Sequence, residues 1–104
     1  STARYFRVAY AAPVLVSPIG GITVSGLKPL LDWDLVLGAT SYTIQVSMNN
    51  TFTTLRVNAT ILAPNTSYIP TVNLPAGTVW YWRVRANGPN GPSAWSAFGT
   101  FVTP

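Results

Sequence analysis

Apolar and polar residues alternate in short stretches along this chain, and a period of two is typical of β-strands with one buried face. The clearest example is Ser41–Ser47, where Tyr42, Ile44 and Val46 are predicted to face inward. The three residues predicted to face solvent are Thr43, Gln45 and Ser47. Residues 79–86 show the same alternation and are predicted to form the central strand.

Turn-forming residues divide the rest of the chain into further short segments with β-strand character. Strands are predicted at residues 13–17, 30–34, 53–60, 67–74 and 95–103. The strongest turn signal lies at residues 87–92, which read Asn-Gly-Pro-Asn-Gly-Pro. Seven strands without helical periodicity predict an all-β fold, a seven-stranded antiparallel sandwich of the immunoglobulin-like kind.

Residues 3–10 form an additional alternating segment in front of these seven strands. One face of this extra N-terminal β-strand would carry its large apolar side chains, Phe6, Val8 and Tyr10. Eight extended residues reach about 26 Å, enough to run the length of a sandwich strand. The proline at position 13 discourages the same ladder from continuing. The chain therefore divides into an N-terminal extension at 1–12, a candidate donor strand or linker, and a domain at 13–104.

The composition narrows the chemistry that this chain could perform. The 104 residues suggest one domain, and they include no cysteine and no histidine. Disulfides, a thiolate metal site, a cysteine nucleophile and the usual proton shuttle are therefore excluded. Only 8% of the residues are charged, and the formal net charge is +4, so the surface opposes self-association weakly.

Two pairs of charged residues are candidate sites. Asp32 and Asp34 are the only acidic residues, and they would share one face of a strand. Two carboxylates on an exposed strand form no cleft, so neither a catalytic pair nor a calcium site is predicted. Arg83 and Arg85 could form an anion-binding or nucleic-acid face, but we favour a structural role, a stack of both guanidinium groups on Trp95, whose place beside them is implied by the family resemblance given below.

Sugar attachment and sugar binding remain open from the sequence. Three Asn-X-Ser/Thr patterns make possible glycosylation sites of Asn49, Asn58 and Asn65. Exposed aromatic side chains could stack on sugar rings, but packing roles are favoured for Tyr68, Tyr81 and Trp95. No apolar run approaches the roughly 20 residues that span a bilayer, so the chain is not expected to be membrane-embedded.

Several of these segments together resemble a fibronectin type III domain, in the form common in prokaryotic surface proteins. The resemblance covers residues 13–104 and rests on the stretches 31–33, 38–47, 74–78, 81–86, 90–96 and 100–104. It implies a fold that hosts many functions. Where the family usually has a tyrosine whose hydroxyl bonds the upstream backbone, this chain has Trp80, whose indole N–H could donate a similar bond.

These observations predict a non-catalytic extracellular structural subunit that assembles with copies of itself into a filament or surface array. The leading strand would pair with a neighbouring subunit through its partner-binding residues, Tyr5, Phe6, Val8 and Tyr10. No catalytic residue, metal, cofactor or nucleic acid is predicted. Two alternatives stay open: a spacer or adhesion module of a larger secreted protein, or an accessory module of a carbohydrate-active enzyme.

Overall fold

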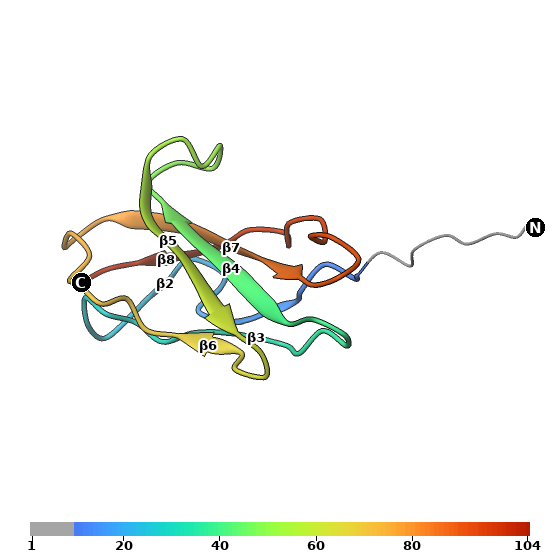
Figure 1. The fold of residues 1–104 in the computed structure, drawn as a ribbon. Helices are drawn as coiled ribbons and strands as arrows, with labels where there is room; N and C mark the ends of the chain where they lie inside the picture. The colour runs from blue at the N-terminus through green and yellow to red at the C-terminus, as the bar shows by residue number, and fades with distance from the viewer. Residues whose placement is uncertain (1–9) are drawn as a thin grey trace, which may run out of the picture.

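The computed structural model describes residues 10–104, which form eight β-strands and no helix in that range (Figure 1). Their bounds in chain order are β1 Leu15–Ser17, β2 Ile22–Thr23, β3 Leu31–Trp33, β4 Ser41–Ser47, β5 Leu55–Leu62, β6 Ser67–Tyr68, β7 Val79–Asn87 and β8 Gly99–Val102. This part of the chain contains no helical segment with the length and hydropathy of a transmembrane helix.

The strands form two sheets of unequal width, with the orders β1-β3-β6 and β2-β8-β7-β4-β5. All neighbouring strands are antiparallel except β2, which pairs in parallel with β8. The predicted immunoglobulin-like sandwich is confirmed, and β2 is a short strand that the sequence pattern did not reveal. In the wider sheet, β4 lies between β5 and β7 and pairs with both over its whole length.

The core lies between the two sheets and is built from the inward residues of β3, β4, β7 and β8. Its largest fully buried side chains are aromatic: Trp33, Tyr42, Trp80, Trp82 and Phe101. The rings of Trp33 and Tyr42 meet edge to face with centroids 5.5 Å apart. The Tyr42 hydroxyl accepts a hydrogen bond of 2.9 Å from the backbone N–H of Val36, which ties the β3–β4 loop to the core.

The closing strand is shorter than predicted, because β8 begins at Gly99 and not at residue 95. In the segment before it, Ser93 and Ser96 are buried, and their hydroxyl groups accept hydrogen bonds from the backbone N–H groups of Ala86 and Val84. Side-chain oxygens thus replace part of the strand ladder along β7, and the chain from 91 to 98 runs beside β7 without regular strand structure.

Two further expectations are corrected by the structure. The predicted strand at 67–74 ends at Tyr68, two residues before Pro70, which has no N–H to offer a ladder. Ser47 was expected to face solvent but is fully buried, at a point where the register between β4 and β5 shifts. Its hydroxyl donates to the carbonyl of Thr54 at 3.0 Å, which satisfies the buried group.

The predicted leading strand at residues 3–10 lies outside the described residues except at its last position. Tyr10 is described, and it is not part of a strand.

Candidate functional site

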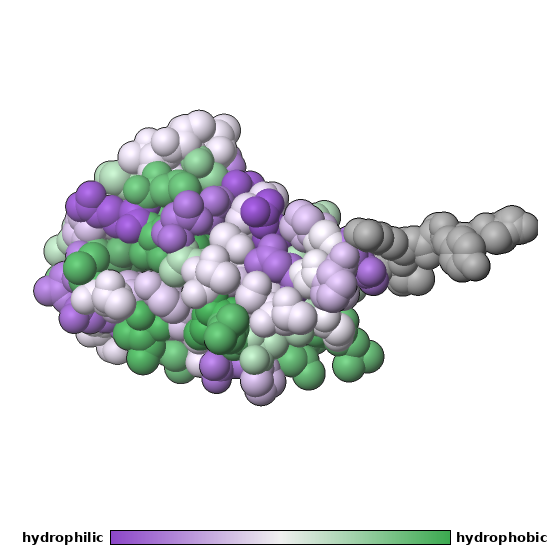
Figure 2. All heavy atoms as spheres, viewed as in Figure 1, coloured by the Kyte–Doolittle hydropathy of each residue, from purple (hydrophilic) through white to green (hydrophobic). Residues whose placement is uncertain are grey.

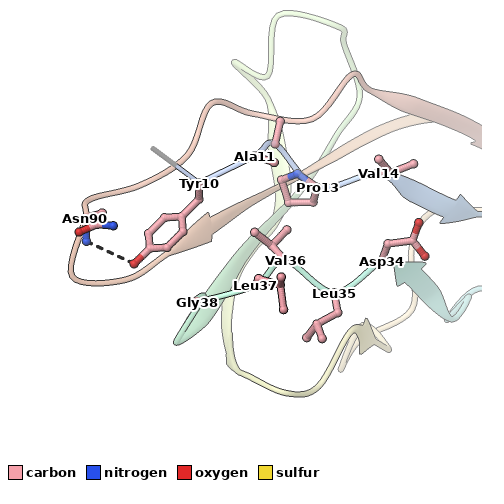
Figure 3. Close-up of a pocket in the computed structure, with 11 residues that line it drawn as sticks. Tyr10, Ala11, Pro13, Val14, Asp34, Leu35, Val36, Leu37, Gly38 and Asn90 are labelled. Carbon is pink, nitrogen blue, oxygen red and sulfur yellow. Dashed lines mark hydrogen bonds between the residues drawn. The ribbon is translucent and has the colours of Figure 1, made fainter. Parts of the chain in front are cut away.

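Tyr10 anchors the start of the described chain to two loops at one end of the sandwich (Figure 3). The backbone N–H of Asn90 donates a hydrogen bond of 3.3 Å to the Tyr10 hydroxyl. The ring lies beside Gly38 of the β3–β4 loop, where an added Cβ atom would be 3.1 Å from the ring. At Gly88 of the β7–β8 loop, an added Cβ atom would overlap the hydroxyl itself. The two glycines therefore make the space that the tyrosine fills.

A cavity of about 680 Å³ opens beside this tyrosine. Its walls come from residues 10–14, from residues 34–38 of the β3–β4 loop and from Asn90 (Figure 3). Three of its aliphatic side chains are exposed to solvent: Val14 by 62%, Leu35 by 57% and Leu37 by 86%. In the space-filling view, hydrophobic residues lie along the lower edge of this end as well as elsewhere on the same face (Figure 2). Exposed apolar side chains that surround one hollow are typical of an interaction site.

A second hollow runs between β1 and the start of β8, and we call it the β1–β8 groove. Its volume is about 580 Å³, and it is lined by Pro13, Val14, Leu15, Ile19, Gly20 and residues 97–100. None of these residues is charged. Val14 also lines the first cavity, so the chain entering β1 forms a ridge between the two hollows.

Arg83 and Arg85 form a stack with aromatic rings on the outer face of the wider sheet. The Cζ atoms of Arg83 and Arg85 lie 4.1 Å and 4.7 Å from the Trp95 ring centroid, and Arg83 lies 4.1 Å from that of Phe52. Arg83 also donates twice to the side-chain oxygen of Gln45, at 3.0 Å and 2.8 Å. Burial of the guanidinium, and then the charge of Arg85, lower the pKa of Arg83 from its usual value. The expected stack on Trp95 is therefore present.

Sequence reasoning missed the part of Phe52 in this stack. Phe52 is 8% exposed, although it lies in the β4–β5 loop, and its φ of 55° is uncommon for a bulky residue. The Asn49 side chain shapes this loop by accepting from the backbone N–H of Thr53 at 3.0 Å. No local pattern marks Phe52, because its partner Arg83 is distant in the sequence.

Trp80 occupies the corner where the family usually has a tyrosine. Its indole N–H donates to the hydroxyl of Thr103 at 3.2 Å, and that hydroxyl donates to the carbonyl of Pro75 at 2.6 Å. The Thr103 hydroxyl also accepts from the backbone N–H of Thr78 at 3.1 Å. The indole therefore reaches the upstream backbone through Thr103 and not directly.

The two acidic residues do not converge on a common site. Asp32 is half-buried within β3, whereas Asp34 is exposed and lines the first cavity. No cluster of three or more histidine, cysteine or acidic side chains exists in the described part of the chain. This arrangement offers no pair of carboxylates around a bound substrate.

The three possible glycosylation sites differ in how far their amide groups are exposed. Asn49 is half-buried, and its amide nitrogen donates to the hydroxyl of Thr53 at 2.7 Å. Asn58 is exposed on β5, and Asn65 is exposed in the turn between β5 and β6. Asn58 and Asn65 are therefore the more accessible acceptors, and attachment of sugar to any of the three stays a prediction.

The other predicted partner-binding residues, Tyr5, Phe6 and Val8, lie outside the described residues. Tyr10 is the member of that set whose place is known, and its ring packs on its own domain. Tyr10 thus fixes the point where the leading segment, residues 1–12, joins the domain. This point lies at the end of the sandwich that carries the exposed aliphatic side chains.

Comparisons with known proteins define the class of this fold. The sequence matches no family model and no curated protein. Among solved structures, an Fn3-like protein from Clostridium thermocellum is 25% identical with a TM-score of 0.62, and the match covers 90% of this chain and 96% of that one. The sixth fibronectin type III domain of human fibronectin type III domain containing protein 3 is 19% identical with a TM-score of 0.58, over 99% and 91%.

Part of a larger enzyme has the same fold. The structure of Streptomyces avermitilis alpha-L-rhamnosidase complexed with L-rhamnose matches with 17% identity and a TM-score of 0.68. That match covers 91% of this chain but 10% of the rhamnosidase. The described chain thus has the fold of an immunoglobulin-like sandwich. More particularly, its fold is that of a fibronectin type III domain.

Proposed function

We propose that this chain is a non-catalytic structural subunit of an extracellular assembly, in which neighbouring copies associate through the leading segment. The observation that carries the proposal is the apolar end of the sandwich around Tyr10. Val14, Leu35 and Leu37 are more than half exposed there, beside the point where the leading segment begins. Such a surface favours association over solvation.

The charge distribution supports the same proposal. Only two acidic and six basic residues occur in the chain, so repulsion between copies is weak. Two of the six basic residues, Arg83 and Arg85, are engaged in the stack on Trp95. The surface around Tyr10 would therefore bind a partner through apolar contacts and not through charges, which suits a structural role better than a catalytic one.

The test compares the full chain with a chain that begins at Tyr10. Light scattering after size exclusion over a wide concentration range should show larger species for the full chain and monomers for the shortened chain. Circular dichroism and the thermal midpoint establish that the shortened chain is folded. A full chain that stays monomeric at every concentration would contradict the proposal.

A second function is favoured by the match to the rhamnosidase, in which a domain of this fold accounts for a small part of a long chain. Under this alternative, the chain is a spacer or accessory module of a larger protein, and residues 1–12 connect it to the preceding module. Measuring the intact mass of the protein from its source separates the two functions. A sugar-array screen then tests whether the module serves carbohydrate binding.

A further inference from the structure

The β1–β8 groove has walls that suit an apolar ligand. Three of its lining residues are exposed to solvent: Val14 by 62%, Ile19 by 45% and Phe98 by 47%. No residue that lines the groove is charged. At Gly99, an added Cβ atom would be 2.9 Å from the Trp82 indole nitrogen and 3.0 and 3.2 Å from side-chain atoms of Ile19 and Leu15. These side chains close the groove over Gly99, and its exposed walls would gain most from apolar side chains.

One wall of this groove is an open strand edge within the described residues, and the other wall is covered by β2 over part of its length. β1 is the outermost strand of its sheet and pairs with β3 alone. On the opposite wall, β2 pairs with β8 at Phe101 and Val102, and the carbonyl of Thr100 accepts from Gly21. Residues 97–99 have no described strand on their outer side. Unpaired edges beside an apolar groove are typical of sites that take up an extended peptide.

We propose that the β1–β8 groove receives the leading segment of a second copy of this chain, with Phe6 and Val8 inserted and Arg7 facing solvent. This inference rests on the proposed function and names the receiving site. Residues two apart on a strand point to the same side and lie about 7 Å apart. That spacing matches a wall of three residues, such as the stretch from Pro13 to Leu15.

The position of Tyr10 favours a second copy over the same chain as the source of the segment. Residues 10–12 line the first cavity and do not line the β1–β8 groove. To reach its own groove, a leading segment would have to reverse direction around Ala9-Tyr10-Ala11-Ala12, which contains no turn-forming residue. A segment from another copy needs no reversal. Because donor and acceptor surfaces differ, the contact is head-to-tail and extends into a filament.

Two full-length variants separate donor from acceptor. The double substitution Phe6→Ser and Val8→Ser removes the donated anchors, and Ile19→Lys places a charge in the groove. Val79→Lys is the matched control, because Val79 is 48% exposed on β7 and does not line the groove. The control should assemble like the wild type, whereas each of the other two variants should need at least tenfold higher concentration to assemble.

Mixing the donor-deficient and groove-deficient variants gives the decisive result. The groove-deficient variant keeps an intact leading segment, and the donor-deficient variant keeps an intact groove. The two can therefore form one contact and no second one, so light scattering should find particles of two chains and nothing larger. If the wild type assembles and Ile19→Lys assembles equally well, the groove assignment is wrong while the proposed function stands. If the mixture stays monomeric, donation into this groove is also refuted. A wild type that never assembles overturns the proposed function itself.

Discussion

Replacing Thr103 by valine should strongly destabilise this domain, although the two side chains have nearly the same volume. Thr103 is 1% exposed, and its hydroxyl is bonded to Trp80, Thr78 and Pro75. Valine leaves all three of those groups without that partner. Trp80 is fully buried, so its indole N–H would find no water in place of the lost hydroxyl. The unpaired N–H should cost about 1–3 kcal/mol of stability. Thr78 and Pro75 are half-buried, and water reaching them limits their joint share to about 1 kcal/mol.

The free energy of unfolding should therefore fall by about 2–4 kcal/mol, and Tm by roughly 10 to 20 °C. Guanidinium unfolding followed by tryptophan fluorescence gives the first quantity, and calorimetry gives the second. Thr100→Val is the matched control, since Thr100 is a half-buried threonine of β8, three residues before Thr103, whose hydroxyl makes no hydrogen bond to the described residues. A loss below about 0.5 kcal/mol for Thr103→Val would refute the reasoning, because changes that small are typical of ordinary surface sites.

Two further substitutions test the other contacts. Gly88→Ala should expel the Tyr10 ring and expose the start of the chain to proteases. Gly26→Ala is the control, because its added methyl group meets open space and should leave cleavage unchanged. Equal cleavage of both variants would contradict the proposed anchoring of the chain by Tyr10. Arg83→Lys keeps the charge but loses the flat group stacked on Trp95, so the free energy of unfolding should fall by about 1 kcal/mol. Urea unfolding measures this change, and an unchanged midpoint would show that the stack contributes nothing.

The strands with a strict period of two were predictable because the pattern itself records which face is buried. β4 was predicted with its observed bounds, and β7 extends one residue further than expected. Ser47 is the exception within β4, because its burial follows from a register shift against β5. Local alternation contains no information about such a shift between strands.

The closing segment shows a different limit. Residues 95–98 read as a strand, yet this region is held to β7 through two serines. Their N–H groups donate to the carbonyls of Ala86 and Val84, and their hydroxyl groups accept the return bonds that backbone carbonyls accept in a regular ladder. A serine that replaces a ladder bond looks the same in the sequence as a serine on an exposed loop. The stack on Trp95 was nevertheless predictable, because the family resemblance placed the tryptophan beside Arg83 and Arg85.

The candidate site was the least predictable part of the molecule. Tyr10 shares an alternating pattern with Phe6 and Val8, so the sequence grouped all three as partner-binding residues. The structure describes only Tyr10, and its docking depends on two glycines, Gly38 and Gly88, that are far apart in the chain. The β1–β8 groove likewise arises from a gap between segments from opposite ends of the sequence. Both features depend on long-range geometry.

The anchoring of Tyr10 also determines how this domain responds to mechanical load. A force applied to the chain in front of Tyr10 acts first on its ring and on its bond to Asn90, before it reaches the ladder between β1 and β3. Release of the ring frees residues 11–13, up to the hydrogen bond that the Val14 carbonyl accepts from the backbone N–H of Asp34, and these three residues span at most about 11 Å. The sandwich stays intact during this step. A chain of such domains would therefore have a short, reversible extension at every junction before any strand separates.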